Sequence, residues 1–365
     1  MIDRGLLPES LRDYRQKYQA VYDIETLEQK LDMIESSSPD AVLKPASIGC
    51  SSNIPNTPDK WFCVKSSERG EVQTMINEFM DHLTALALEY KKCIPKPITD
   101  LIETIRLKLT DKALKFKRRL ELQEDLNCLK KIEVLPVYAF NGARFDLVVL
   151  MPYIGQWCGA EIKTNMIKRG AQYMMLTVGD IQFRDILDFT APTNLAGYLS
   201  TWGASEIKSV FPYSYFSRIE DLEATIEFPP KEAFFNELKQ IDIADQDYND
   251  AKTKYDELRN LPEDDPDHIS NFKGWLKYYN MIDCKPLIEA ITNSFDKFWE
   301  CFRIDANLHL SLPSMAFKAM LNLSDKTMPC VVSFNEANEE IRQLFKRLQM
   351  GSTLNGAEKR NAELG

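Results

Sequence analysis

Apolar and polar residues alternate near the start of the chain in a way that predicts a sheet. Residues 19–26 read Gln-Ala-Val-Tyr-Asp-Ile-Glu-Thr, a short β-favouring run with acidic residues at alternate positions. Alternate side chains of a strand point to the same face, so Asp23 and Glu25 are expected on one face. Residues 46–50 and 60–65 predict two further strands, separated by a turn that contains two prolines.

Helical spacing follows this strand region. Apolar side chains in residues 71–90 recur at intervals of four and three, which predicts an amphipathic helix packed on the sheet. Residues 96–131 are highly charged, with leucines and isoleucines at helical spacing, and predict one or two further helices. A basic cluster in this stretch has the chemistry to contact phosphate: Lys115, Lys117, Arg118 and Arg119. Charged runs on helices are commonly solvated faces, and from the sequence we favour that interpretation.

The middle of the chain predicts a strand, a tight turn and a helix in succession. Residues 134–140 form an apolar run in which Pro136 must lie at the start or on an edge, because it lacks a backbone N–H. This run leads into residues 141–146, Asn-Gly-Ala-Arg-Phe-Asp, where Asn-Gly is a turn signal. The apolar residues 147–151 then open a helix.

The second half of the chain is less regular. Residues 170–189 alternate around Gly179-Asp180 and predict a hairpin. Residues 190–265 are rich in aromatic residues and prolines, and we interpret them as an ordered but irregular insertion. Residues 274–303 predict one or more helices with a buried apolar stripe made of Leu287, Ile291, Phe295 and Phe298.

Composition narrows the class of protein. The 365 residues carry a formal net charge of −10 and are 44% hydrophobic, which is typical of globular chains with room for two or three domains. No apolar run approaches the roughly 20 residues of a membrane span, so no membrane partner is expected. The start of the chain lacks an export signal pattern, and we expect an intracellular protein, without distinguishing a nuclear from a mitochondrial location. An acidic balance disfavours a protein that coats nucleic acid, but it allows a local basic groove beside a metal site.

The eight cysteines include no Cys-x-x-Cys pair. Their scatter argues against both a zinc site and a disulfide framework, so reduced thiols are expected. The sequence holds three histidines, so we expect no catalysis built on several of them.

Three acidic clusters follow one another along the chain: Asp23-x-Glu25, Asn141-x-x-x-Phe145-Asp146 and Tyr279-x-x-x-Asp283. Hydrolysis of a phosphodiester by two metal ions needs carboxylates able to hold hard divalent cations about 3.5–4 Å apart. Residues four apart share a helix face, so Tyr279 is placed to orient a water beside Asp283. Each cluster alone is a weak signal, because such short patterns arise by chance. Their conjunction predicts a metal-dependent nuclease site.

Together these clusters resemble the Exo I, Exo II and Exo III motifs of the 3′–5′ proofreading exonuclease of family B DNA polymerases. More narrowly, the chain is similar to the protein-primed branch found in Polinton/Maverick transposons and related viruses. Residues 211–216, 228–235 and 243–248 are close to segments that this family carries between its second and third motifs. The resemblance covers residues 19–325, and family-typical sequence recurs at residues 334–348.

This resemblance implies an α/β, ribonuclease-H-like exonuclease domain with a mixed central sheet flanked by helices, plus helical and irregular insertions. It implies two Mg²⁺ or Mn²⁺ ions, and Asp23, Glu25, Asp146 and Asp283 as their ligands. With Tyr279, these are the expected catalytic residues of a nuclease that trims single-stranded 3′ ends during DNA replication. The implied domains are an N-terminal arm (1–18), the exonuclease domain (19–310, with the insertion 190–265) and the start of the polymerase region (311–365).

Further residues are implied to bind DNA. Thr26, Asn141 and Phe145 are expected to touch the frayed 3′ end, with Phe145 stacking or wedging against a base. The family also places a lysine near the scissile phosphate, for which Lys231 and Lys254 are both candidates. The implied partners are a single-stranded 3′ end, primer–template DNA and a terminal protein.

The sequence departs from the family in one respect. It contains no Asp-x-x-Ser-Leu-Tyr-Pro motif and no Tyr-x-Asp-Thr-Asp motif, which supply the aspartates of the polymerase palm. We therefore expect no nucleotide addition by this chain alone. Two alternatives stay open: a stand-alone exonuclease, and a catalytically silent module that binds DNA or protein.

Overall fold

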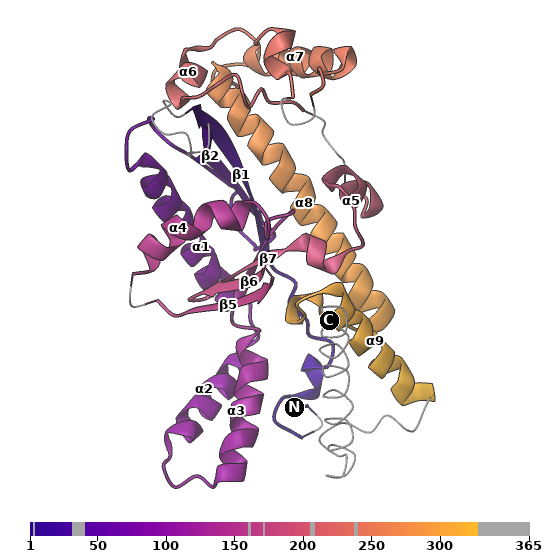
Figure 1. Ribbon diagram of the computed structural model, residues 1–365. Coiled ribbons are helices and arrows are strands. Elements are labelled where there is room, and N and C mark those ends of the chain that lie inside the picture. The colour runs from indigo at the N-terminus through magenta and orange to yellow at the C-terminus, as the bar shows by residue number, and fades with distance from the viewer. Residues whose placement is uncertain are drawn as a thin grey trace, which may run out of the picture. The chain divides into compact units, whose positions relative to one another are not determined.

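A mixed sheet with helices on both faces forms the centre of this α/β chain (Figure 1). The computed structural model describes residues 1–2, 4–30, 41–159, 162–170, 172–204, 209–236 and 240–327. Within them the sheet has seven strands in the order β3-β2-β1-β4-β7-β6-β5. The strands are β1 (Ala20–Lys30), β2 (Ala41–Ser52), β3 (Lys60–Cys63), β4 (Leu135–Ala139), β5 (Thr164–Arg169), β6 (Gln172–Val178) and β7 (Ile181–Asp185).

Strand β1 pairs parallel with β4, and β4 pairs parallel with β7, whereas the outer pairs are antiparallel. The helices of the described chain are α1 (Glu71–Lys92), α2 (Lys96–Thr110), α3 (Phe116–Lys130), α4 (Asp146–Cys158), α5 (Leu195–Thr201), α6 (Ile219–Ala224), α7 (Asp245–Arg259), α8 (Phe272–Phe302) and α9 (Leu312–Thr327).

Strand β1 has one apolar and one acidic face, as its alternation predicts. The ring of the buried Tyr22 lies 5.7 Å from that of Phe79 on α1. The next side chain, Asp23, points the other way and accepts a hydrogen bond from Asn280 on α8. The sheet is therefore covered by α1 on one face and by α8 on the other, and Asp23 faces α8.

Pro136 is tolerated within the central strand β4 because it comes near its start. The Leu135 N–H donates to Asp180 on the β7 side, so the position of Pro136 faces β1. Pairing with β1 begins only at Val137, one residue later. The missing N–H of proline therefore interrupts no ladder.

Two sequence interpretations need correction. Residues 164–169 form strand β5, which was missed because nearly all its side chains are exposed, so no apolar alternation marks it. The stretch 190–265 is more regular than expected, since it contains α5, α6 and α7. In α7, Ala251, Tyr255 and Leu258 are buried at helical spacing, a pattern obscured by the prolines and aromatic residues that surround it.

Other expectations about elements are confirmed. The basic region folds as the pair α2 and α3, and the third acidic cluster lies on α8, which is one continuous helix. Its stripe is buried at Leu287, Ile291 and Phe295 and half-buried at Phe298.

The chain divides into two compact units, residues 1–312 and 313–365. The functional boundaries at 1–18, 19–310 and 311–365 stay predictions, and the family-like residues 334–348 lie outside the described residues. Among the described residues, no helix is long and apolar enough to cross a membrane, and the seven described cysteines form no disulfide.

Candidate metal centre

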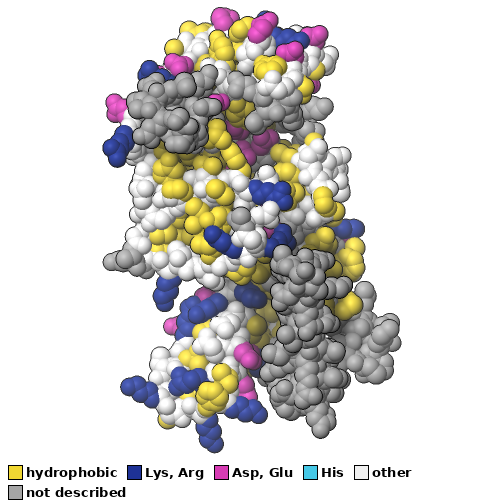
Figure 2. Space-filling model, in the orientation of Figure 1, with side chains coloured by type: hydrophobic (Ala, Val, Ile, Leu, Met, Phe, Trp, Pro, Cys, Tyr) yellow, Lys and Arg dark blue, Asp and Glu magenta, His cyan; other side chains and the backbone are white. Residues whose placement is uncertain are grey.

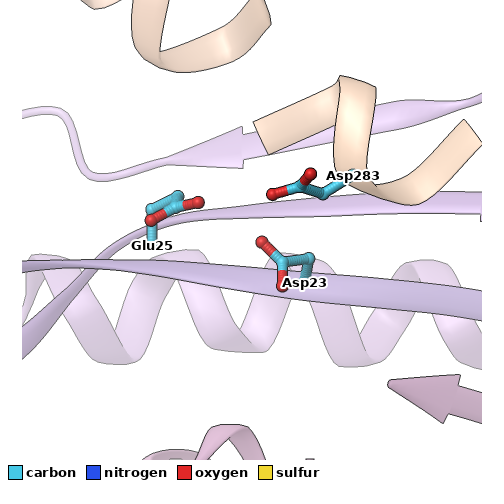
Figure 3. Close-up of side chains that lie close together, drawn as sticks. All are labelled: Asp23, Glu25 and Asp283. Carbon is cyan, nitrogen blue, oxygen red and sulfur yellow. The ribbon is translucent and has the colours of Figure 1, made fainter. Parts of the chain in front are cut away.

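Three carboxylates from distant parts of the chain meet above the sheet (Figure 3). Asp23 and Glu25 project from β1, two residues apart, and Asp283 projects from the middle of α8. One oxygen of each carboxylate lies within 4.8 Å of the other two. Glu25 is buried, and Asp23 and Asp283 are partly buried.

A glycine on β2 lets α8 come this close. Gly49 is the register partner of Asp23 across the β1–β2 ladder. A Cβ atom on Gly49 would lie 2.9 Å from Cys284 Sγ and 3.1 Å from the carbonyl oxygen of Asn280. A side chain at this position would therefore push away the helix that carries Asp283.

Asn280 joins the helix to the strand. Its Nδ2 donates to the backbone oxygen of Asp23 at 3.1 Å and to Asp23 Oδ2 at 3.0 Å. Its Oδ1 accepts from Ser47 Oγ at 3.2 Å, and its side chain is fully buried. Asn280 thus orients the Asp23 carboxylate and satisfies one of its oxygens. The sequence interpretation missed this residue, although it lies one turn before Asp283 on the same helix face.

The second cluster reaches the same region through a turn pinned by a buried aspartate. Asp185, at the end of β7, accepts backbone N–H bonds from Asn141 at 3.0 Å and Ala143 at 3.1 Å. Asn141 has a left-handed backbone with φ 62°, as suits an Asn-Gly turn. The turn sets Asp146 as the first residue of α4. Asp185 was also missed, and only its place at the end of a buried strand hints at it.

Asp146 is buried beside β1 but is not one of the three clustered carboxylates. Its Oδ1 accepts the backbone N–H of Ile24, the residue between Asp23 and Glu25, at 3.3 Å. Its position at the start of α4 places it at the positive end of the helix dipole. The structure thus brings Asp146 next to the cluster, and its role as a fourth ligand stays a prediction.

The carboxylates share an unfavourable electrostatic environment. Burial raises the pKa of Asp23 to about 6, although hydrogen bonds with Asn280 and Glu25 oppose the shift. Burial and the charges of Asp23 and Asp283 raise the pKa of Glu25 well above its usual range. Burial, and then the charge of Asp23, likewise raise the pKa of Asp146. Without a counter-charge, the charged form of each of these carboxylates is therefore disfavoured in the folded protein.

This donor set fits a hard divalent cation. Carboxylate oxygens are the preferred ligands of Mg²⁺ and Mn²⁺. A cation would also offset the burial that raises the pKa of Asp23 and the burial and charge repulsion that raise that of Glu25. Asp23, Glu25 and Asp283 could therefore hold a metal ion.

Two tyrosine hydroxyls lie beside the acidic cluster. Tyr279 lies one helical turn before Asp283, as predicted, and burial and the charges of Glu25 and Asp283 raise its pKa. The hydroxyl of Tyr213 donates to that of Tyr279 at 3.1 Å, and Tyr213 also contacts Glu25. Phe211 holds this segment on α8, since its ring is 5.7 Å from that of Tyr279. Residues 211–216 carry part of the family resemblance, but the sequence pattern assigned Tyr213 no role.

The residues expected to bind DNA lie on several different elements of the fold. Thr26 is buried on β1, directly after Glu25, where a bulge shifts the register against β2. Asn141 and Phe145 are half-buried in the turn before α4. Lys231 pairs with Asp245, and Lys254 with Glu257 at 3.1 Å. None of these contacts involves the acidic cluster, so the choice between the two lysines stays open.

The chain matches none of the protein-family models and none of the curated proteins with which it was compared. The fold and the site therefore describe the class of protein. Its described residues form an α/β structure with a seven-stranded mixed sheet flanked by helices, and they carry an acidic cluster suited to a divalent cation. This sheet is compatible with a ribonuclease-H-like fold.

Proposed function

We propose that this chain is the 3′–5′ exonuclease portion of a protein-primed family B DNA polymerase, with a ribonuclease-H-like domain. Its substrate is the single-stranded 3′ end of DNA, and its cofactors are two Mg²⁺ or Mn²⁺ ions. The observation that carries the proposal is the meeting of Asp23, Glu25 and Asp283 within 4.8 Å, although Asp283 lies far from the other two in the sequence. The order of the three clusters along the sequence supports it.

The roles of the residues follow from their contacts. Asp23, Glu25 and Asp283 would hold the metal, with Asp146 as the further ligand expected for a second ion. A bound divalent cation supplies an acidified water and stabilises charge on the leaving oxygen. Asn280 keeps Asp23 oriented. Tyr279 stays protonated because its pKa is raised, and Tyr213 donates to its oxygen, so the proton of Tyr279 can orient the attacking water.

The test is digestion of 5′-labelled single-stranded DNA by the purified chain. We expect stepwise shortening from the 3′ end with Mg²⁺ or Mn²⁺ and none with chelator. Asp23→Ala and Asp146→Ala should each remove nearly all activity, because each removes a predicted ligand. Asp250→Ala on α7 is the control, since this exposed carboxylate contacts Gln246 and is not part of the cluster.

The outcomes separate the alternatives. Wild-type protein that is inert with both metals would support the silent binding module and reject the nuclease. Equal digestion of RNA and DNA would favour a stand-alone exonuclease. Incorporation of a labelled deoxynucleotide by this chain would show that a second catalytic site had been missed.

A further inference from the structure

The helical hairpin α2–α3 is apolar inside near its base and carries charge at its tip. Three isoleucines of α2 and three leucines of α3 are buried: Ile98, Ile102, Ile105, Leu122, Leu126 and Leu129. Beyond Ile105 three large apolar side chains are exposed, with exposed fractions of 72% for Leu107, 76% for Phe116 and 49% for Leu120, whereas Leu109 and Leu114 are partly buried. In Figure 1 the two helices lie side by side below the sheet, away from α6 and α7.

The tip is strongly basic in an acidic chain. Residues 104–120 contain seven Lys or Arg and one Asp, whereas the chain as a whole has a net charge of −10. Figure 2 shows Lys and Arg side chains spread over this lower region. Four exposed lysines there have no ion pair within the described part of the chain: Lys108, Lys112, Lys115 and Lys117.

Lys108 lies in the last turn of α2, where the helix dipole favours a cation, but no such local role is evident for Lys115 and Lys117. Arg119 closes the turn by donating to the carbonyl oxygens of Leu109 and Asp111 at 2.8 and 2.6 Å. Lys115 and Lys117, by contrast, lie at the cap and in the first turn of α3, where no acidic residue accompanies them. Cations are unfavourable there because the helix dipole is positive at its start. Local stability therefore does not account for the charges of Lys115 and Lys117.

We infer that the tip of the α2–α3 hairpin binds single-stranded nucleic acid, with its lysines on phosphates and Phe116 against a base. Phe116 stands between Lys115 and Lys117 and is 76% exposed. An aromatic ring flanked by cations is the arrangement that binds single strands, because an unpaired base offers a face for stacking. A duplex would use the lysines but would leave the exposed apolar side chains unsatisfied. From the sequence alone we favoured a solvated helix face for this basic cluster. That interpretation changes because Phe116 is exposed and because its neighbouring lysines have no ion pair among the described residues.

This inference does not depend on the nuclease proposal, and its test excludes metal. The full chain is titrated, in chelator, into a fluorescein-labelled 20-nucleotide oligo(dT) and into a 20-base-pair duplex, and anisotropy is measured at several salt concentrations. The variant Lys115→Glu with Lys117→Glu removes two proposed phosphate contacts. Its matched control is Lys163→Glu with Lys252→Glu, two exposed lysines elsewhere that also lack ion pairs within the described residues.

For oligo(dT), we expect the hairpin variant to bind about tenfold more weakly at low salt. Its salt slope should fall by about 1.4, because each lysine–phosphate interaction on a single strand adds about 0.7 to the slope. Phe116→Ala should weaken oligo(dT) binding by about tenfold without changing the slope. Glutamate suits the first turn of a helix, so the hairpin variant should melt no lower than the wild type.

Three results would overturn the inference. Unchanged affinity of the hairpin variant, or an equally large weakening in the Lys163 and Lys252 control, would show that the surface does not bind nucleic acid. An equal effect of Phe116→Ala on duplex and oligo(dT) would reject the single-strand assignment.

Discussion

Neutralising Asp23 should stabilise the metal-free protein while abolishing its proposed activity. The pKa of Asp23 is raised to about 6 from an ordinary value of 3.8, chiefly by burial. Each pKa unit corresponds to about 1.4 kcal/mol, so the ionised carboxylate costs the folded state about 2 to 3 kcal/mol at pH 7. In Asp23→Asn the new amide oxygen can still accept the hydrogen bond from Asn280.

The sign of the pH dependence follows from the raised pKa. A carboxyl whose pKa is higher in the folded than in the unfolded state contributes most to stability below pH 4, where it is protonated in both states. That contribution is lost as the pH rises from about 4 through about 6. Metal-free wild type should therefore lose stability over this range, and Asp23→Asn should lose less.

The assay is thermal unfolding in chelator, followed by circular dichroism at pH 4 and pH 7. At pH 7 we expect Asp23→Asn to melt about 3 to 5 °C above the wild type, and at pH 4 to melt at the same temperature. Mg²⁺ should raise the melting temperature of the wild type and have little effect on the variant. Asp250→Asn is the control and should match the wild type throughout, since that carboxylate is exposed. A variant that melts below the wild type by the same amount at both pH values would refute the reasoning, because the effect of the substitution would then not depend on the charge of Asp23.

Three further predictions concern the position of α8 and the tyrosine pair. Gly49→Ala should destabilise the fold by about 1 to 3 kcal/mol in urea denaturation and weaken Mn²⁺ binding, because the new Cβ atom would collide with Asn280 and Cys284. The control Gly155→Ala, on an open face of α4, should change neither the stability nor the Mn²⁺ affinity. Tyr279→Phe should slow single-turnover hydrolysis by about 10²-fold and keep metal affinity, whereas Asp283→Ala should lose both. Tyr213→Phe should slow hydrolysis less than Tyr279→Phe does. If Tyr213 acts through the Tyr279 hydroxyl, Tyr213→Phe should cause no further loss of rate in a Tyr279→Phe background. Additive effects of the two substitutions would instead assign Tyr213 an independent role.

Local pattern determined much of this protein. The alternation of β1 placed Asp23 and Glu25 on one face, because side chains of a strand alternate whatever the strand packs against. The periodicity of residues 71–90 identified α1, and the Asn-Gly turn predicted a helix opening at residues 147–151, one residue after the observed start of α4 at Asp146. These features depend on neighbours a few residues away, so a single sequence contains them.

Tertiary structure decided how the site is assembled. Asp283 meets Asp23 because Gly49 leaves room for α8 on the sheet, an approach of three segments that no local pattern encodes. Asn280 and Asp185 were missed because their partners lie far away in sequence, at Asp23 and at Asn141. Strand β5 and helix α7 were missed for the opposite reason: their local patterns are weak or obscured, and pairing and packing impose their structure. The sequence thus supplied the candidate carboxylates, whereas long-range packing decided which of them meet, because only the folded chain brings distant residues within contact distance.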